Sequence, residues 1–405
     1  MNAIYLIHKS DPKDCPPLLN VAVGLRRAGY AVTVMAASCV RATADWLAER
    51  QVTVQVLGGY CDRDRTAFPI RWWNMIAFSV KVRPVLMQIK RQGGAIIIGS
   101  LETAVALLPH LPSIRYGLLM HELYDRQTRW RLFRATILRR AAFVVVPNGI
   151  RAALLRYWCR LTISPFVLYN RPLEIEASAS QSEPVKKMVH AVEAVKASGR
   201  RIVLYQGHMD LKERQLLPLA EVCEAKKDEW QLVLLGNDKN DSLIQLRRVC
   251  PSLLYLGYLP APEHLFVTAA CDVGVVSYNW ESLNSIFCAP NKIWEYSKFG
   301  KPILANDMYC VQEIVERFNA GISVNFSDRN AISAALDALR SEYRQCAVGA
   351  HRLYESCNNA DAMRRLARLV DEAFFPDQTG CGTFEEPTRV RVLEGVRGDD
   401  VSSPH

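Results

Sequence analysis

The residues best suited to chemistry lie in one short stretch, Pro290–Tyr296, which is followed by Gly300. Proline favours the first turn of a helix, and the free backbone N–H groups of that turn attract anions. Lys292 lies in this turn, where a cation opposes the helix dipole unless an anion compensates. Glu295 follows one turn later on the same face. The spacing indicates a site where Lys292 contacts a phosphate and Glu295 a ribose; an ordinary surface helix with mixed charges is the alternative.

The same stretch resembles a known signature. Pro290–Tyr296 and then Gly300-Lys-Pro-Ile303 are similar to the donor-site motif of the retaining glycosyltransferases of family 4, in which P-x-K-x-x-E-Y precedes G-x-P-V. The resemblance implies a GT-B fold, with two Rossmann-like domains facing a cleft and a nucleotide-sugar donor held by the C-terminal domain. It places Asn291, Lys292 and Glu295 in the donor site.

Two further segments resemble that donor domain. Leu204–Arg214 is similar to its first strand and loop, where a glycine is followed by two spaced cations that hold the donor diphosphate. The matching residues are Gly207, His208 and Arg214. Tyr255–Tyr258 is similar to a strand end that lines the nucleotide-base pocket, so the resemblance implies that Tyr258 contacts the base.

In the N-terminal half, Leu118–Glu122 resembles the strand end that carries the family's active-site histidine. His121 is therefore expected near the transferred sugar, and His121 and Glu295 are the candidate catalytic residues. The resemblance implies transfer with retention of the anomeric configuration, in which the departing diphosphate helps to deprotonate the acceptor. The acceptor would be a glycan or a lipid-linked molecule, as in the synthesis of cell-surface polysaccharide or glycolipid.

Three features depart from the family's pattern. Phe287 stands where the family usually has a second glutamate, Asp11–Pro17 replaces a Gly-Gly loop after the first strand, and His208 replaces an arginine. Glu281 and Asn284 are candidates to reach the sugar in place of residue 287. Two other functions stay open: a nucleotide-sugar epimerase of the same fold, and a catalytically decayed nucleotide-sugar-binding or scaffold protein.

Several common site motifs are missing. No G-x-G-x-x-G turn follows the strands expected at Ile4–Ile7 and Ile202–Tyr205, which disfavours NAD. The 12 cysteines form no C-x-x-C pair, which disfavours a metal cluster or a redox motif. A D-x-D pair, as used by metal-dependent transferases of another fold, occurs at Asp62–Asp64, but a match of three residues is common by chance and its loop position predicts a surface turn. We therefore expect neither a metal nor another cofactor.

Short β-branched runs alternate with amphipathic segments along most of the chain, which indicates parallel sheets covered on both faces by helices. The alternation lapses in a polar, turn-rich segment. We therefore expect a Rossmann-like acceptor domain at residues 1–170, a linker at 171–200 and a Rossmann-like donor domain at 201–375. The polar residues 376–405 are expected to form a disordered tail.

The chain has a formal net charge of +9, which suits an anionic partner. No motif for nucleic-acid recognition accompanies this charge. Arg71–Arg83 and Arg126–Arg140 combine cations with aromatic residues and contain no acid; such helices suit an anionic membrane surface, and packing of the aromatic residues into the core is the alternative. The start lacks the features of a signal peptide, and no apolar run reaches the roughly 18–20 residues of a membrane span. A cytoplasmic protein, peripheral on the inner face of the cell membrane, is expected.

Overall fold

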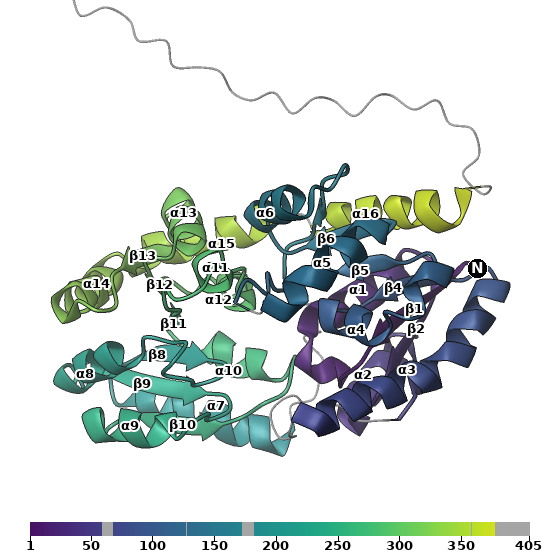
Figure 1. Ribbon diagram of the computed structural model, residues 1–405. Coiled ribbons are helices and arrows are strands. Elements are labelled where there is room, and N and C mark those ends of the chain that lie inside the picture. The colour runs from purple at the N-terminus through teal and green to yellow at the C-terminus, as the bar shows by residue number, and fades with distance from the viewer. Residues whose placement is uncertain (59–67, 127, 172–181, 358, 377–405) are drawn as a thin grey trace, which may run out of the picture.

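The computed structural model describes residues 1–58, 68–126, 128–171, 182–357 and 359–376, and it shows two α/β domains side by side (Figure 1). Three segments that the sequence analysis discusses lie outside the described residues: Asp62–Asp64, residues 172–181 of the expected linker and residues 377–405 of the expected tail. The predicted pair of parallel-sheet domains is confirmed.

The N-terminal domain is built on a seven-stranded parallel sheet with the order β3-β2-β1-β4-β5-β6-β7. Its strands are β1 (Ala3–His8), β2 (Ala31–Ala36), β3 (Thr53–Val56), β4 (Ala95–Ile98), β5 (Gly117–Leu119), β6 (Phe143–Val146) and β7 (Phe166–Val167). Its helices are α1 (Pro16–Arg27), α2 (Arg41–Glu49), α3 (Phe68–Arg91), α4 (Leu101–Ala106), α5 (Thr128–Arg140) and α6 (Gly149–Cys159), with short 3-10 turns at Pro12–Asp14 and Leu111–Ser113. Every residue of β4 is buried, as expected for a strand covered on both faces.

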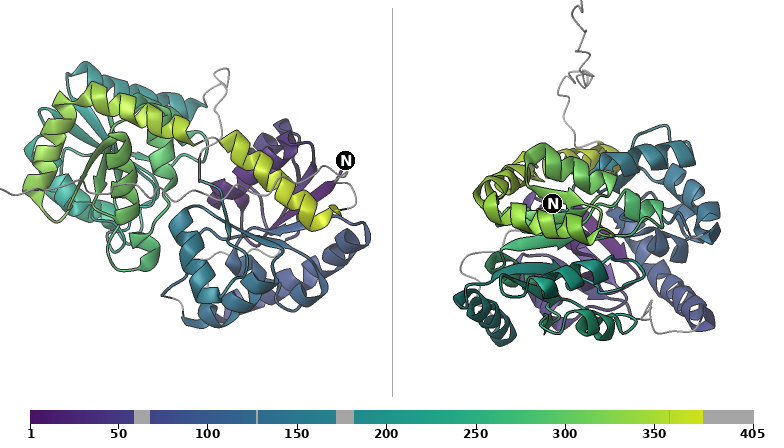
Figure 2. Two further views of the ribbon diagram at one scale, coloured as in Figure 1. Left: turned by 90° about the horizontal axis from the view of Figure 1, so that it is seen from above. Right: turned by 90° about the vertical axis from the view of Figure 1, so that its left-hand side faces the viewer.

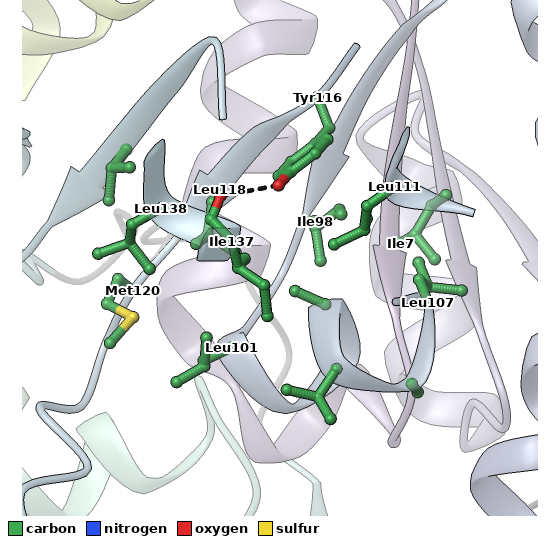
Figure 3. Packing of buried hydrophobic residues seen from close by; sticks show 14 of the residues in the cluster. Ile7, Ile98, Leu101, Leu107, Leu111, Tyr116, Leu118, Met120, Ile137 and Leu138 are labelled. Atoms are coloured by element: carbon green, nitrogen blue, oxygen red, sulfur yellow. Dashed lines mark hydrogen bonds between the residues drawn. The ribbon is translucent and has the colours of Figure 1, made fainter. Parts of the chain in front are cut away.

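Two apolar clusters fill the two faces of this sheet. One contains Ile98 and Leu118 and packs under α3, α4 and α5 (Figure 3). Within this cluster, the buried Tyr116 donates a hydrogen bond from its hydroxyl to the carbonyl oxygen of Ile137 at 2.7 Å. The opposite cluster, which contains Ile97 among others, packs under α1 and the last helix, α16 (Asn359–Phe374).

The C-terminal domain is built on a six-stranded parallel sheet with the order β10-β9-β8-β11-β12-β13. Its strands are β8 (Arg201–Gln206), β9 (Trp230–Leu235), β10 (Leu254–Gly257), β11 (Val273–Val276), β12 (Ile303–Asn306) and β13 (Gly321–Val324). Its helices are α7 (Glu183–Ala197), α8 (Leu217–Ala225), α9 (Ser242–Val249), α10 (His264–Ala270), α11 (Leu283–Ile286), α12 (Asn291–Lys298), α13 (Tyr309–Phe318), α14 (Arg329–Ser341) and α15 (Tyr343–Ser356).

The chain crosses between the domains at both ends of the C-terminal domain, which differs from the expected boundaries. Helix α7, within the expected linker, buries Val185 and Val192 in the C-terminal core. Helix α16 was assigned to the C-terminal domain, but it lies on the N-terminal domain (Figures 1 and 2). There it buries Leu366 and Val370, and its Ala367 carbonyl accepts a hydrogen bond from the Tyr30 hydroxyl at 3.0 Å. The apolar residues of α16 cover part of one face of the N-terminal sheet. The alternation of strands and helices along the sequence does not show which sheet this helix covers.

The two sheets meet through the loops at the carboxyl ends of their strands. The loops after β5, β6 and β7 all contact the segment 281–289 that follows β11. Ligands of open parallel sheets bind at this edge. The fold therefore places any site between the domains.

Candidate donor and sugar site

Three adjacent strands of the C-terminal sheet end in glycine. Gly207 follows β8, Gly236 follows β9 and Gly257 ends β10, with φ values of +121°, +145° and +90°. Close packing adds a second requirement at Gly236, where a Cβ atom would lie 1.9 Å from the carbonyl oxygen of Gly207. Glycine is the residue that tolerates both conditions. The strand ends therefore carry no side chains, and a ligand can approach their backbone.

Helix α12 begins beside these strand ends. Pro290 is its N-cap, and no side chain among the described residues caps its first N–H groups. Tyr296 anchors the helix to the sheet, with its hydroxyl 3.1 Å from the Leu204 carbonyl oxygen in β8 and 3.3 Å from that of Val275 in β11. Gly274 makes room for this ring, because a Cβ atom there would lie 2.2 Å from Tyr296 Cγ. The tyrosine of the motif thus fixes the helix whose N-terminus faces the cleft.

Lys292 and Arg214 converge over two tyrosine rings. The Lys292 Nζ lies 4.4 Å from the ring centroid of Tyr205 and 5.8 Å from that of Tyr278. The Arg214 Cζ lies 4.2 Å from the Tyr278 centroid. Gly207 lies beside the same ammonium group, since a Cβ atom on it would be 3.0 Å from the Lys292 Nζ. Lys292 and Arg214, which are 78 positions apart in the sequence, therefore place two cations against the same pair of tyrosine rings at the start of α12.

The carboxylate that pairs with Arg214, at 3.5 Å, belongs to the exposed side chain of Glu213. Burial lowers the pKa of Lys292, and the neighbouring Arg214 lowers it further. The buried Nε of Arg214 has no hydrogen-bond partner among the described residues. An anion with several oxygen atoms, such as a diphosphate, would neutralise both cations and accept from the free donors of Arg214 and α12.

Glu295 points to a different set of partners. Its carboxylate accepts a hydrogen bond from Gln206 Nε2 at 2.5 Å and lies 3.3 Å from His264 Nε2. Gln206 is itself held by the Thr268 hydroxyl at 2.6 Å. Burial alone would raise the pKa of Glu295, but His264, Gln206 and Lys292 outweigh it and hold the pKa below its usual value. Glu295 is therefore an ionised carboxylate at the wall of the cleft.

The remaining predicted donor residues lie around this centre. Asn291 shares a hollow with Glu295, His264 and, from the N-terminal domain, Asn20 and Asn170. His208 is exposed, and its carbonyl oxygen accepts from the Tyr205 hydroxyl at 2.8 Å.

Tyr258 follows Gly257 at the end of β10 and is 44% exposed. Burial raises the pKa of its phenol, and the carboxylates of Asp14 and Asp11 raise it further. These acids belong to the loop after β1 in the N-terminal domain. It lies two strands from β8, at the far end of the row of three glycines.

His121 lies on the N-terminal side of the cleft, two residues beyond β5. Neither of its buried ring nitrogens has a hydrogen-bond partner among the described residues. Burial lowers its pKa to about 3, with further contributions from His8 and Arg151. His121 is therefore a neutral imidazole, able to donate one hydrogen bond and accept another.

The side chain of Phe287 is part of the contact between the domains. It packs against the apolar cluster of the N-terminal domain that contains Ile98 and Leu118. Its carbonyl oxygen accepts from Arg151 Nε at 2.9 Å, and Arg151 also donates to the carbonyl oxygens of Asn284, at 3.0 Å, and His121. A buried arginine thus ties the backbone around His121 to the segment that leads into α12.

The rest of this segment is also bound to the N-terminal domain. Asp125 accepts from the backbone N–H groups of Leu283, at 2.7 Å, and Asn284, at 3.2 Å, and so caps α11. The Asn284 side chain accepts from the Leu123 N–H at 3.0 Å, and Arg126 pairs with Glu281 at 3.1 Å. Glu281 and Asn284, the expected replacements for a glutamate at position 287, are therefore engaged in the contact between the domains.

The site contains residues that sequence reasoning missed. Tyr205 lies in the segment Leu204–Arg214, whose resemblance concerns the glycine and the two cations, and Tyr278 follows β11 outside the segments named above. Gln206 precedes Gly207 directly, and its polar side chain at the end of an apolar strand was an available signal. No signal in the sequence indicates a role for His264, because only the packing of α10 against α12 brings it to Glu295.

Comparison with known proteins agrees with the fold. The chain is similar in structure to sucrose-phosphate synthase from Thermosynechococcus elongatus, with a TM-score of 0.66 at 15% identity over 92% of this chain and 99% of the other. It is similar to HepE from Anabaena in complex with UDP-glucose, with a TM-score of 0.67 at 14% identity over 92% and 99%. It is also similar to WaaG, a glycosyltransferase involved in lipopolysaccharide biosynthesis, with a TM-score of 0.56 at 12% identity over 91% and 99%. At these identities the likenesses show the fold, which is GT-B.

A family match adds the class of activity. Residues 200–342 match the family described as Glycosyl transferases group 1, and these residues contain β8, Gly207, Arg214 and the whole of α12. The chain is a GT-B glycosyltransferase. No curated protein matches its sequence. The matched segment covers most of the C-terminal domain and includes Lys292 and Glu295, whereas the N-terminal domain of this glycosyltransferase is related to the others by its fold.

Membrane spans and metal sites can be assessed for the described part of the glycosyltransferase. Among the described residues no helix is long and apolar enough to cross a membrane, and no group of three or more His, Cys, Asp or Glu side chains could hold a metal ion.

Helix α3 exposes a stripe of Trp73, Ile76 and Val80, of which Trp73 is 71% exposed and Val80 65%. In α5, by contrast, Arg134 and Arg139 bind the carbonyl oxygens of Leu123 and Cys159, both at 2.7 Å.

Proposed function

We propose that this chain transfers a sugar from a nucleotide-sugar donor to a glycan or lipid-linked acceptor, with retention of configuration and without a metal ion. The observation that carries the proposal is the convergence of Lys292 and Arg214 over Tyr205 and Tyr278, beside the uncapped start of α12. Fixed cations at the departing diphosphate can do what a metal does elsewhere, because they stabilise the negative charge that develops on it.

The roles of the residues follow from their places. Lys292, Arg214 and the N–H groups of α12 bind the diphosphate, with Gly207 allowing close approach. Glu295, held by Gln206 and His264, accepts hydrogen bonds from the ribose. Asn291 and His208 border this site, and Tyr258 borders the base. His121 contacts the transferred sugar from the N-terminal side.

The reaction follows from the resemblance to family 4. The bond between the anomeric carbon and the diphosphate oxygen breaks, and the acceptor oxygen bonds to the same face of that carbon. The acceptor proton passes to the departing diphosphate, which carries the negative charge away as nucleoside diphosphate. The two cations assist this step because they lower the free energy of the diphosphate as its charge grows.

UDP-sugars are the first donors to test, since HepE of Anabaena was observed with UDP-glucose and shares the fold. Synthesis of a cell-surface polysaccharide or glycolipid is the pathway class that we propose. Helix α3 supports a lipid-linked acceptor: beside its apolar stripe it exposes Lys81, Arg83, Lys90 and Arg91, and the helix contains no acidic residue. Apolar residues flanked by cations suit the surface of an anionic membrane.

The experiment that tests the function follows donor turnover in EDTA, with and without acceptors, for UDP-, GDP- and ADP-sugars. Transfer predicts acceptor-dependent release of nucleoside diphosphate and a new glycosidic product with the donor's anomeric configuration. A change of the sugar without an acceptor would indicate an epimerase. Donor binding without any turnover, seen as thermal stabilisation alone, would indicate a binding protein.

A further inference from the structure

Three positions at the carboxyl edge of the N-terminal sheet share one face. β1 pairs with β4 so that Ile7 lies beside Ile98, and β4 pairs with β5 so that Ile98 lies beside Leu118. The next residues of β1 and β4 are His8 and Gly99. Because side chains alternate between the faces of a sheet, His8 lies on the same side as Leu6. His121, two residues beyond β5, lines the same hollow as Leu119. Leu6 and Leu119 both belong to the cluster under α1.

Gly99 allows the two histidines to approach each other. It lies between His8 and His121 in the strand order β1-β4-β5. A Cβ atom on Gly99 would lie 2.9 Å from His8 Nδ1, closer than real Cβ atoms come to any neighbour. The His8 imidazole therefore lies over the bare backbone of Gly99, on the side of β1 that leads toward His121. His8 also contributes to the lowered pKa of His121, after burial.

Both rings have unsatisfied hydrogen-bonding capacity. His8 is only 7% exposed, and its Nδ1 has no partner among the described residues, which is also true of both ring nitrogens of His121. A buried polar atom without a partner is costly, so native proteins rarely keep one without a reason. The neighbouring Lys9 is not available to either ring, because its ammonium group pairs with Glu102 at 3.1 Å.

The histidine pair lies next to the donor residues. His121 lines a hollow together with Asn20 and Asn170. The same two asparagines line the adjoining hollow that contains Asn291 and Glu295. A ligand that extends from Glu295 toward the N-terminal domain therefore meets His121. His8 lies behind it at the end of β1, two strands along the sheet edge from β5.

We propose that His8 is a second sugar-contacting histidine, which acts with His121 to bind hydroxyl groups of the transferred sugar. The inference rests on the proposed function of the cleft. A neutral imidazole offers one donor and one acceptor, which is the complement of a sugar hydroxyl. Burial lowers the pKa of His8 to about 4, with Lys9 lowering it further and Glu102 opposing, so this ring is neutral in the working range.

The test compares the affinities of a UDP-sugar and of UDP for the wild type, His8→Ala and Gly99→Ala. His8→Ala removes the ring, and Gly99→Ala keeps it but pushes it away. We expect both variants to bind UDP like the wild type and to lose about 10-fold in UDP-sugar affinity and in kcat/KM, the scale of one lost hydrogen bond. The matched control is His110→Asn, in the same domain, whose ring Nε2 is already bonded to Ser79 at 3.1 Å.

Each other outcome overturns a defined statement. Unchanged UDP-sugar affinity and turnover in a folded His8→Ala or Gly99→Ala protein would overturn the role of His8. A higher KM for the acceptor alone would overturn the assignment to the transferred sugar. If His8→Ala does not fold, Gly99→Ala decides the question alone. Failure of the wild type to transfer any sugar would contradict the proposed function instead, and UDP-sugar affinity would still test His8.

Discussion

Glu295 and His264 form a pair in the wall of the cleft, with the Glu295 Oε1 3.3 Å from the His264 Nε2. The second carboxylate oxygen is held by Gln206, so the side chain is fixed before any ligand arrives. A group that is already oriented loses little conformational entropy on binding. The pair explains how a glutamate one helical turn from Lys292 can serve a different part of the ligand.

The binding of nucleoside diphosphate should weaken at alkaline pH. The charged form of Lys292 binds the anion, and burial lowers its pKa, so the charge is lost at a lower pH than for an ordinary lysine. We expect the affinity for UDP to fall as the pH rises from 7 toward 10. Lys292→Arg keeps its charge over this range and should flatten the profile. Calorimetric titration at several pH values checks this, and parallel profiles for the two proteins would contradict it.

Restoring the family's glutamate at position 287 should destabilise the protein. Phe287→Glu would place a carboxylate against the apolar cluster of the N-terminal domain, at a cost of about 2 kcal/mol or more. Phe287→Leu keeps an apolar side chain and is the matched control. Urea unfolding compares the two. If Phe287→Glu were as stable as Phe287→Leu and more active than the wild type, position 287 would belong to the sugar site.

Acidification should destabilise the fold partly through His8. Its pKa is lowered to about 4 in the folded state, whereas an unfolded histidine titrates near 6.5. The unfolded chain therefore binds an extra proton between these values, and stability is lost as the pH falls below about 6.5. This histidine should contribute about 2 kcal/mol of the loss between pH 7.5 and 5. His8→Asn should remove that part of the pH dependence in urea unfolding; an unchanged slope would mean that His8 is protonated in the folded state.

Attachment to an anionic membrane should depend on the exposed stripe of α3. Trp73→Ser should reduce binding to vesicles containing anionic lipid by about 10-fold or more, because a large apolar side chain no longer enters the interface. High salt should release the wild type by screening the cations. The control is Tyr157→Ser, which removes another exposed aromatic ring, 81% exposed, from the same domain. Equal binding to neutral and anionic vesicles would leave α3 without this role.

The sequence was most informative about features that depend on residues close to one another in the chain. The alternation of strands and helices predicts both parallel sheets, and the spacing of Pro290, Lys292 and Glu295 predicts one helix start with two polar side chains. The partners from distant segments could not be predicted: His264 meets Glu295 only when α10 packs against α12. Likewise, the sequence shows only that Phe287 stands where the family has a glutamate, and the fold shows the apolar cluster that it packs against.

The boundary of the C-terminal domain could not be predicted for a similar reason. Helix α16 has the amphipathic pattern of any helix that covers a sheet, and the pattern does not say which sheet it covers. Its Met363 lies against Gly24 of α1, where even a Cβ atom would be 2.5 Å from the Met363 Cε. Close packing of this kind is specified by the complementary shapes of two distant segments.

The central claim is that Lys292 binds the diphosphate and Glu295 the ribose without a metal ion. Calorimetric titration of UDP and of uridine in EDTA, for the wild type, Lys292→Ala and Glu295→Gln, tests it most directly. We predict that the wild type binds UDP equally well in EDTA and in Mg²⁺, and that Lys292→Ala weakens UDP but not uridine. Glu295→Gln should weaken both ligands roughly 10- to 150-fold, the scale of a charge-assisted hydrogen bond. Loss of UDP binding in EDTA with recovery in Mg²⁺, or wild-type affinities in both variants, would contradict the account.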